Sequence, residues 1–396
     1  MADPAQFHRC RVGGFGMTNA PIIQGWCPGA LRPMQSGDGL VVRIRPIGGC
    51  LSQAQAAGIA DLSARHGNGL IDLSARANVQ LRGVTEASHQ TLIAGLADLG
   101  LLDATPQAET ARNIIVTPYW GEGDGTQDLA AALMQALAVP DAPLLPGKFG
   151  YGVDTGATPV LRAISADIRI ERAGGGFLVW ADGAATGAVV PSIEAAIAAV
   201  QALTAWFLQS DGITKGRGRM AALIARGAML PASFQAAEIP TTNPHTPAPG
   251  LLPAGAMVGF DFGQMQAQTL AALAQLGPLR VTPWRMLLLE GATTLPEIPG
   301  LITRPNDPML RVIACTGAPG CLQAHQPTRD LARRLAPHMP DGTLHISGCT
   351  KGCAHPGAAQ TTLVATPQGF DLIRNGSAAD TPAQRGLSPY LTEFPQ

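Results

Sequence analysis

The chain has 396 residues, a length that favours two or three compact units over one. Hydrophobic residues make up 46% of it, charged residues only 14%, and the formal net charge is −1, so there is no basic field for nucleic acid or anionic lipid. The longest apolar stretch, residues 193–208, is too short to cross a bilayer. Residues 1–14 lack the apolar segment of a secretory signal. We therefore expect a cytoplasmic protein without nucleic-acid or membrane partners.

The first half of the chain is predicted to alternate strands and helices. A strand is expected over residues 39–45, a helix over 51–66, and an apolar strand over 73–84 that is closed by Gly83. Further elements are expected in the order helix 86–102, strand 112–116, helix 128–137, strands 166–172 and 176–180, and helices 193–208 and 219–226.

The second half repeats the opening of the first. A strand is predicted over residues 256–260, a helix over 264–276, and an apolar strand over 281–292 that is closed by Gly291. The alternative is a chance similarity between two α/β segments. Between the halves, residues 239–253 contain five prolines among polar residues and are predicted to form a linker. The later elements expected are helix 328–335 and strands 361–366 and 370–373.

Four cysteines near the C-terminus form two close pairs, Cys315-x5-Cys321 and Cys349-x3-Cys353. A [4Fe–4S] cluster requires four thiolates, one for each iron. Both pairs lie in glycine-rich sequence, which lets the backbone approach a cluster closely and aim its N–H groups at the sulfurs. The spacing therefore predicts an iron–sulfur cluster.

Two other interpretations of these cysteines stay open. Four cysteines can also bind zinc, although the five-residue gap in the first pair fits structural zinc sites poorly. They could also be buried thiols without a ligand. The remaining cysteines, Cys10, Cys27 and Cys50, bring the total to seven, an odd number that suits a reducing cytosol better than a disulfide framework.

Duplicated α/β halves with this cysteine pattern in the second half resemble the nitrite and sulfite reductase family, over about residues 25–375. The resemblance implies an α+β fold, sandwich-like, of two pseudo-repeated halves. Each half has a ferredoxin-like half-domain and a cluster- or haem-type α/β domain. In that family the fourth cysteine, here Cys353, also bridges the cluster to a sirohaem iron. The implied domains are half-domain 1 over 20–85, α/β domain 1 over 86–238, the linker over 239–253, half-domain 2 over 254–300 and the cluster-binding domain over 301–380.

Four segments resemble a narrower branch of that family, the precorrin-3B synthases. They are residues 76–83 (RANVQLRG), 279–285 (LRVTPWR), 315–321 and 347–356, and they occur in the family's order along the chain. The chain is identified as a member of this branch on these segments. The branch implies an oxidoreductase, a monooxygenase of cobalamin biosynthesis that uses O2 to hydroxylate precorrin-3A at C20 and closes a γ-lactone.

The resemblance also implies which basic residues contact the tetrapyrrole carboxylates. Arginine binds a carboxylate through two parallel hydrogen bonds, which suits this role. Family motifs correspond to Arg43 and Arg45 before Gly48-Gly49, to Arg76, and to Lys148 in Pro-Gly-Lys-Phe-Gly; Arg112 and Arg285 are further candidates. An exposed face or a surface ion pair is the ordinary alternative for each of them.

Two departures from the reductases count against sulfite or nitrite reduction. The second family lysine is Gly150 here, and the glutamine after the strand arginine is Ala77. Reduction of an anion by six electrons needs several cationic donors to bind it and to deliver protons. Two alternatives are nevertheless retained: a sirohaem-dependent sulfite or nitrite reductase subunit, and an electron-transfer protein without a substrate.

The cofactors and partners implied by the branch are a [4Fe–4S] cluster, an additional non-haem iron, precorrin-3A, O2, and a separate reductase or ferredoxin as electron donor. Sirohaem is expected only under the reductase alternative. The chain shows no His-x-Asp/Glu…His triad for the extra iron. His355, two residues after Cys353, is the nearest candidate ligand, and simple packing beside the cluster is its ordinary alternative. Catalytic residues are not predicted.

Overall fold

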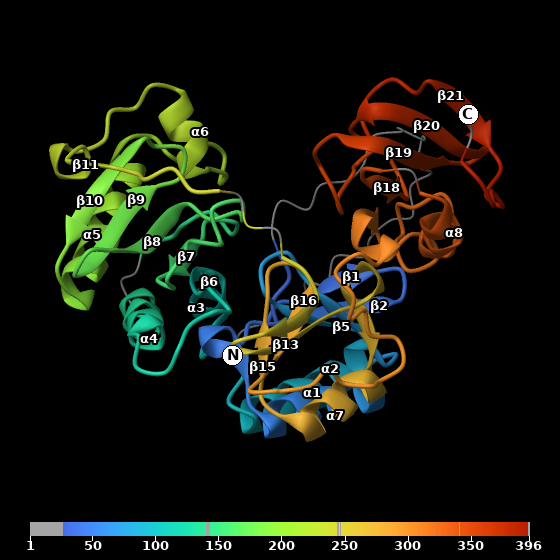
Figure 1. Cartoon of the computed structure of the whole chain (residues 1–396), viewed down its shortest axis with the longest axis horizontal. Helices are drawn as coiled ribbons and strands as arrows, with labels where there is room; N and C mark the ends of the chain where they lie inside the picture. The colour runs from blue at the N-terminus through green and yellow to red at the C-terminus, as the bar shows by residue number, and fades with distance from the viewer. Residues whose placement is uncertain (1–26, 140–142, 244, 246, 340, 395–396) are drawn as a thin grey trace, which may run out of the picture.

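The computed structural model describes residues 27–139, 143–243, 245, 247–339 and 341–394. Four β-sheets make up its framework (Figure 1). Two five-stranded sheets form a central body. A six-stranded sheet forms the first lobe, drawn in green, and the remaining five-stranded sheet forms the second lobe, drawn in orange and red.

The central body is built by an exchange of strands between the two halves of the chain. The first sheet has the order β1 (Met34–Ser36), β2 (Gly39–Ile44), β5 (Val79–Val84), β4 (Leu70–Leu73) and β14 (Gln264–Gln266). The second has the order β12 (Gly250–Leu252), β13 (Gly255–Gly259), β16 (Met286–Glu290), β15 (Leu279–Val281) and β3 (Cys50–Leu51). Strand β14 thus completes the sheet of the first half, and β3 completes the sheet of the second. Neither sheet is complete without the other half.

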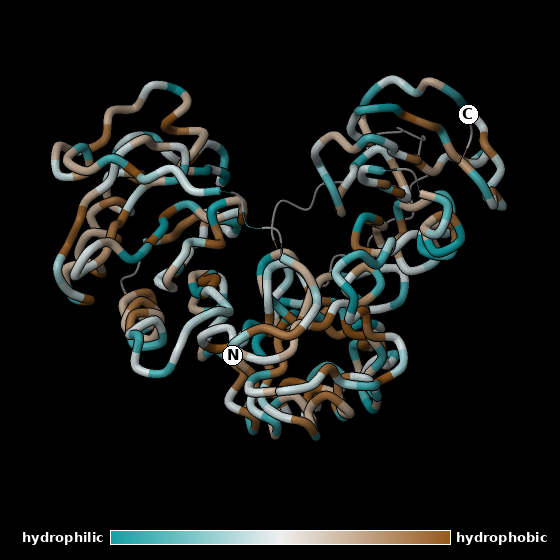
Figure 2. The backbone as a smooth tube through the Cα atoms, in the orientation of Figure 1, coloured by the Kyte–Doolittle hydropathy of each residue, from teal (hydrophilic) through white to brown (hydrophobic). Residues whose placement is uncertain are grey.

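One hydrophobic core serves both central sheets. Helices α1 (Gln53–His66), α2 (Glu86–Asp98) and α7 (Ala267–Leu276) contribute to it, and α1 packs against both α2 and α7. Every second strand residue points into this core, and the resulting apolar segments lie around the helices in Figure 2. Helix α1 begins with a capping box in which Ser52 and Gln55 bond each other's backbone N–H groups.

The predictions of single strands over 73–84 and 281–292 are wrong. Each range contains the last residue of one strand, a turn, and the second strand of a hairpin. In the first half, Ser74 Oγ accepts hydrogen bonds from the backbone N–H groups of Arg76 and Asn78, and this turn separates β4 from β5. Ala77 and Arg285 take the same position in the two turns, with φ of 53° and 60°. The repeat is therefore real, but in each half the segment expected as one strand belongs to a two-stranded hairpin.

The first lobe contains a half-parallel sheet. Strands β6 (Ile114–Val116), β7 (Tyr151–Asp154) and β8 (Ile168–Ala173) run parallel, whereas β9 (Gly176–Ala181), β10 (Thr186–Val190) and β11 (Ala237–Glu238) continue the sheet antiparallel. Its helices are α3 (Pro106–Ala111), α4 (Thr126–Leu137), α5 (Ile193–Gln209) and α6 (Met220–Ala225). Phe207 and Tyr151, both almost fully buried, lie in its core.

The second lobe repeats the strand directions of the first. Strands β17 (Val312–Ala314), β18 (Leu344–Ser347) and β19 (Ala359–Thr366) are parallel, and β20 (Gly369–Gly376) and β21 (Gln384–Leu387) follow antiparallel. Helix α8 (Arg329–Leu335) packs near β17. Short 3-10 helices complete the chain: η1 (Ile47–Gly49), η2 (Ala232–Phe234), η3 (Asp261–Gly263), η4 (Pro308–Arg311) and η5 (Ala336–His338). The duplication therefore extends from the central body to the lobes.

The expected fold class, two α/β halves of one design, is confirmed by these sheets. The predicted domain limits stay a proposal, and several elements cross them. Helix α2 packs on α1 although it follows position 85, β12 lies inside the predicted linker, and β21 lies beyond position 380. Positions 20–26 of the first predicted domain fall outside the described residues. Within the described ranges no helix combines the length and apolarity needed to cross a bilayer.

Because Leu51 lies in the exchanged strand β3 and is 1% exposed, its truncation should weaken both halves together. We expect Leu51→Ala to lower the free energy of unfolding by about 2–5 kcal/mol. Urea denaturation followed by circular dichroism measures this loss. The matched control is Leu276→Ala at the exposed end of α7, which should cost far less. Equal losses in the two variants would contradict the exchange as a source of stability.

Candidate functional site

The floor of the candidate site is the outer face of the first central sheet. Strand register places Arg43, Gln80, Asp72 and Gln264 directly opposite one another across β2, β5, β4 and β14. Arg43 Nη2 donates to Gln80 Oε1 at 2.7 Å, and Gln264 Nε2 donates to Asp72 Oδ1 at 2.8 Å. The helical core covers the opposite face of the sheet. The sheet is thus apolar on one side and polar on the other.

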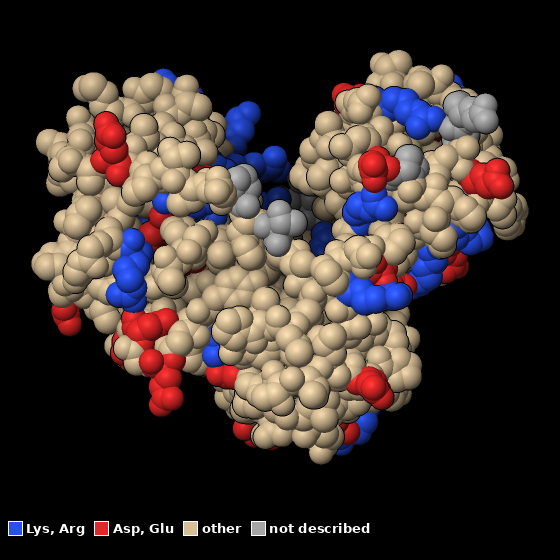
Figure 3. Space-filling model, viewed as in Figure 1, with Lys and Arg blue, Asp and Glu red and all other residues tan. Residues whose placement is uncertain are grey.

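A hollow separates the two lobes above this central body (Figure 3). Lysine and arginine atoms gather on its walls in the space-filling view. A loop from each lobe contacts the central body. Arg76 donates a hydrogen bond to Lys148 O of the first lobe, and Arg82 donates one to Gly320 O of the second. The hollow is therefore bordered by three parts of the molecule.

Three of the predicted substrate residues, Arg43, Arg45 and Arg76, form one cationic group. Burial lowers the pKa of each of them, and the mutual repulsion of neighbouring guanidinium groups adds to this lowering. The nearby sulfur of Cys27 partly opposes the lowering of the Arg43 pKa. Arg45 forms an ion pair with Glu109 at 3.2 Å, both side chains being almost fully buried. Like charges gathered in this way favour an anionic ligand.

Two of these arginines have N–H groups to spare. Among the described residues, Nε of Arg45 and Nη1 of Arg76 are buried and make no hydrogen bond, whereas Nη1 of Arg45 is the atom that faces Glu109 Oε1 in the ion pair. An unpaired buried N–H group costs free energy unless a ligand or water pairs with it. These atoms are therefore the strongest local signal for a bound acceptor.

Arg76 lies in the β4–β5 turn, not inside a strand as its sequence context suggested. Its Nη2 donates to the backbone oxygen of Lys148 at 3.0 Å and to Ser165 Oγ at 3.2 Å, and both acceptors belong to the first lobe. The Lys148 side chain itself is exposed. The structure thus brings Arg76 and the Lys148 segment together at the border between the central body and the first lobe.

Arg112 has a different place. Its Nε and Nη2 donate to both oxygens of Asp103, at 2.7 and 2.8 Å, and its Nη1 donates to the backbone oxygen of Arg45 at 3.0 Å. All three nitrogens are engaged, so Arg112 supports Arg45 instead of presenting free donors.

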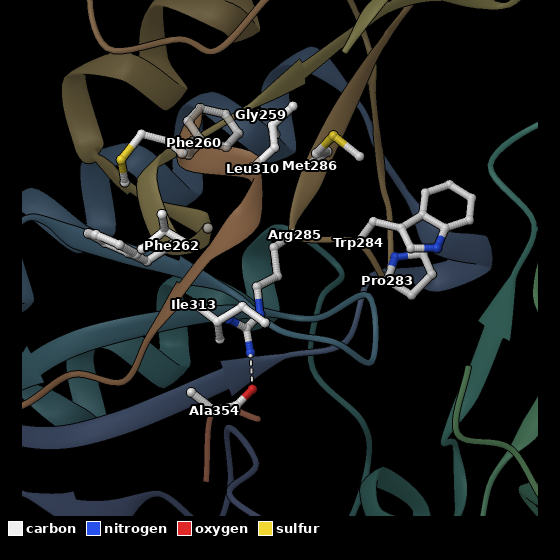
Figure 4. Close-up of a pocket in the computed structure, with 13 residues that line it drawn as sticks. Gly259, Phe260, Phe262, Pro283, Trp284, Arg285, Met286, Leu310, Ile313 and Ala354 are labelled. Carbon is white, nitrogen blue, oxygen red and sulfur yellow. Dashed lines mark hydrogen bonds between the residues drawn. The ribbon is translucent and has the colours of Figure 1, made fainter. Parts of the chain in front are cut away.

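Arg285 belongs to a second cationic group, beside the cysteine loops. Its Nη2 donates to the backbone oxygen of Ala354, next to Cys353, at 3.3 Å. Burial lowers its pKa, and the positive charge of Arg329 lowers it further, whereas Asp72 opposes the change. Figure 4 shows Arg285 entering a pocket of about 220 Å³ between aromatic and aliphatic side chains. The lining includes Phe260, Phe262, Trp284, Met286 and Ile313.

The four motif cysteines come together at one edge of the second lobe. Cys315 and Cys321 follow β17, and Cys349 and Cys353 follow β18, its parallel neighbour. All four are free thiols. The N–H of Gly348 donates to Cys315 Sγ at 3.1 Å, and a side chain at Gly348 would lie 3.3 Å from that sulfur. A glycine is therefore needed for this approach.

The sulfurs influence one another. A hydrogen bond with Cys353, together with backbone N–H groups, lowers the pKa of Cys315 to about 6 against the effect of burial. The same bond, burial and the charges of the other three cysteines raise the pKa of Cys353. In the described part of the chain, no three His, Cys, Asp or Glu side chains converge on one point to bind a single ion. A [4Fe–4S] cluster binds each sulfur to a different iron, so it does not require three of these side chains to meet at one point.

Two histidines lie near this edge. The rings of His345 and His355 are 5.5 Å apart, and a ring nitrogen of His355 lies 3.2 Å from the backbone oxygen of Ala358. His345 is fully buried, and neither of its ring nitrogens has a partner among the described residues. Desolvation lowers its pKa to about 4, and the positive charges of His355 and Arg285 add to this. A role of His355 in binding iron stays a prediction.

The first lobe carries no cysteine at the corresponding edge. Its strands β6 and β7 end at Val116 and Asp154, where the second lobe has the loops of Cys315 and Cys349. Asp154 Oδ2 accepts hydrogen bonds from the N–H groups of Val160 and Leu161, both at 2.6 Å. The two lobes share an architecture, and among their described residues only the second carries cysteines at this edge. Cys10 lies outside the described residues.

Sequence reasoning missed four polar residues around the site: Asp72, Arg82, Arg219 and Arg329. In β5 the side chains of Leu81 and Arg82 point to opposite faces of the sheet. The expected strand over 73–84 includes the turn before β5, so it does not show which face Arg82 occupies. Arg219 is paired with buried Asp167 across the first lobe, a contact that only the fold reveals.

Comparison with known proteins agrees with this geometry. Residues 32–99 match the nitrite/sulfite reductase ferredoxin-like half-domain. A precorrin-3B synthase from Sinorhizobium sp. is 33% identical over 403 aligned positions, which cover 92% of this chain and 86% of the relative. The chain belongs to the precorrin-3B synthase family. As a precorrin-3B synthase family member it is an enzyme, and the branch suggested by the four sequence segments is confirmed.

The fold has a solved counterpart as well. The NirA protein of Mycobacterium tuberculosis superimposes with a TM-score of 0.62 at 20% identity, covering 87% of this chain and 77% of that one. At this identity the likeness concerns the fold alone. This chain therefore shares its fold with NirA over most of its length.

Replacing Cys321 by Ser should abolish the cluster and destabilise the second lobe, because ligand binding by these loops is linked to their folding. Iron and sulfide analysis of anaerobically purified protein measures this loss. Cys50→Ser, at a free cysteine of the central body, is the matched control and should retain full content. A Cys321→Ser protein with normal iron and sulfide would show that the ligand set is wrong.

Burial raises the pKa of Asp154 to about 6, partly opposed by its two N–H donors. The folded protein therefore favours the protonated carboxyl, and the stability this provides is lost as pH rises from about 4 to about 6. Asp154→Asn should remove that slope and gain on the order of 2 kcal/mol relative to the parent at pH 7. Urea denaturation at a series of pH values tests this, with Asp98→Asn at the exposed end of α2 as control. Parallel pH profiles of Asp154→Asn and the parent would contradict the assignment.

Proposed function

We propose that this protein is the O2-dependent monooxygenase that hydroxylates precorrin-3A at C20 and closes the γ-lactone in aerobic cobalamin biosynthesis. Electrons would enter through a [4Fe–4S] cluster held by Cys315, Cys321, Cys349 and Cys353. The observation that supports the proposal is that the same protein has a group of donors for an anionic ligand and a group of free thiols. Unpaired, buried arginine N–H groups lie on the central body, and four free thiols lie on the second lobe.

The arginines supply the binding of a polycarboxylate. A tetrapyrrole of this kind carries several acetate and propionate groups. Nε of Arg45 and Nη1 of Arg76 offer free N–H donors to them, and Arg43, whose Nε and Nη2 bond Gln80, adds positive charge. Arg76 also contacts the first lobe, so a carboxylate bound there would be held where two parts of the protein meet. Hydrogen bonds to charged groups contribute about 1.5–3 kcal/mol each.

Gly150 supports a monooxygenase over a sulfite or nitrite reductase. A side chain at this position would meet Asn113 Nδ2 at 2.6 Å and the Asn113 backbone oxygen at 2.9 Å. Asn113 is itself fixed, since its Nδ2 donates to the backbone oxygen of Phe149 at 2.8 Å. The reductase lysine therefore has no room here, and the site lacks that cation and proton source.

The four thiols supply the place for one-electron transfer, chemistry that amino-acid side chains do not provide. When bound, the cluster would supply single electrons for the reduction of O2, of which one atom enters the substrate and the other leaves as water. The chain's own part is to hold the thiols and to keep cations beside them: Arg285 lies near Cys353, and Arg329 lies near Cys315. Because the described residues offer no convergent donor set for the additional iron, no step is assigned to it.

The deciding experiment is anaerobic purification followed by iron, sulfide and ultraviolet–visible analysis, with and without precorrin-3A and O2. Four sulfides per chain, no Soret band, and O2-dependent conversion of precorrin-3A to its hydroxylated lactone are expected. Bound sirohaem with sulfite or nitrite reduction would instead support the reductase alternative. Normal cluster content without any tetrapyrrole binding would support an electron-transfer protein. A separate reductase or ferredoxin is proposed as the donor.

Arg76→Ala should weaken precorrin-3A binding by about tenfold or more, since one charged hydrogen-bonding group is lost, while iron and sulfide stay unchanged. Equilibrium titration monitored by tetrapyrrole absorbance measures the affinity. The control is Arg65→Ala on the exposed face of α1, where affinity should not change. Unaltered affinity in Arg76→Ala would return this arginine to a purely structural role.

A further inference from the structure

One backbone carbonyl, that of Gly320, connects the first half of the chain to the loop of Cys315 and Cys321. Its oxygen accepts hydrogen bonds from Ser36 Oγ at 2.7 Å, from Gly37 N at 3.1 Å and from Arg82 Nη2 at 3.1 Å. A carbonyl oxygen has two lone pairs, so three donors saturate it. The carbonyl belongs to the same peptide unit as the N–H of Cys321.

That peptide unit is also fixed from within its own loop. The N–H of Cys321 donates to the backbone oxygen of Gly317 at 2.8 Å, and Gly317 adopts a φ of 69°. The N–H and the carbonyl of the Gly320–Cys321 peptide are therefore both held, one by the second lobe and the other by the central body. The backbone at Cys321, and with it the start of its side chain, is set by this pair of contacts.

The tip of the β1–β2 hairpin leaves no spare room at this contact. A side chain at Gly37 would lie 2.2 Å from the backbone oxygen of Pro319 and 3.2 Å from the nitrogen of Cys321. The obstacle is backbone, which cannot rotate away as a flexible side chain would. The hairpin and the cysteine loop are thus in direct backbone contact.

Arg82 is oriented for its role by a neighbouring acid. Its Nε and Nη2 donate to the two oxygens of Asp38 at 3.0 and 2.6 Å, and the residue is only 6% exposed. A second acid, Asp72, lies 3.8 Å away and also approaches Arg329 at 3.6 Å. A guanidinium locked in this way donates along a fixed direction.

We propose that Ser36, Gly37 and Arg82 are positioning residues for the cluster ligand Cys321. They act through the Gly320 carbonyl, so that the first half of the chain sets the geometry of a cluster bound by the second. The proposal rests on the proposed cluster. Arg82 additionally keeps a positive charge beside the loop, and such a charge favours the reduced form of an iron–sulfur cluster.

Gly37→Ala and Arg82→Gln test this in the full-length protein. Both variants should show amide exchange about tenfold faster across residues 315–322, since one or two hydrogen bonds are lost. Iron and sulfide per chain should fall in both. In Arg82→Gln, the midpoint potential of the remaining clusters, measured by redox titration with electron paramagnetic resonance, should shift to more negative values.

Two controls separate positioning from general destabilisation. Gly175→Ala lies in the β8–β9 turn with no atom within 4 Å of the added carbon, and it should match the parent in every measurement. Arg82→Lys keeps a cation and a donor, so it should restore most of the potential and part of the cluster content.

The possible outcomes are distinct. Parental exchange rates and an unchanged potential in both Gly37→Ala and Arg82→Gln would overturn the proposal. If the parent protein itself carried no iron and sulfide, the proposed function would fail, and the exchange rates of residues 315–322 would still decide whether the hairpin holds the loop. Should Gly37→Ala fail to fold, Arg82→Gln and Ser36→Ala remain to decide it.

Discussion

The exchange of β3 and β14 between the two central sheets is the constraint on which the rest of the structure depends. Each half supplies the edge strand of the other half's sheet, so the two sheets and their shared core form as one unit. The same crossing continues at the lobes. Arg82, on the first sheet, holds the loop after β17 of the second lobe, and Arg280, on the second sheet, donates to Pro118 and Trp120 after β6 of the first lobe. The cysteine loops are thereby placed over the sheet of the opposite half.

The two central sheets carry chemically different side chains at equivalent positions of their outer faces. In the first, Arg43 and Gln80 face outward, whereas Met257 and Leu288 stand at the corresponding places in the second and are packed in a small apolar cluster. The first sheet has an ion pair between Asp72 and Arg82. At the equivalent positions of the second sheet the charges are exchanged, with Arg280 in place of the acid and Glu290 in place of the arginine. Only the first sheet therefore offers a polar floor, and only the second lobe offers thiols.

The sequence predicted the duplicated fold and grouped Arg43, Arg45 and Arg76 and, separately, the four motif cysteines, because motifs and spacing carry that information. The iron–sulfur cluster itself stays a prediction. It failed at the hairpin turns, where Ser74 Oγ accepts hydrogen bonds from the N–H groups of Arg76 and Asn78 and a turn interrupts the expected continuous strand. It also could not reveal that Arg112 is saturated by Asp103 or that Arg82 meets Gly320. The Arg82 contact joins segments far apart in the sequence, and the Arg112 contact depends on how residues 103–112 fold, so motifs alone identify neither partner.

The apolar outer face of the second sheet has a consequence for stoichiometry. A duplicated protein with two equal floors would take up two polyanionic molecules. Here Met257 and Leu288 exclude charged groups from the second position, and Tyr119 and Trp284 cover it with stacked rings 5.8 Å apart. A single equivalent of ligand should therefore saturate each chain. The second copy of the fold then serves as scaffold for the single polar floor of the first.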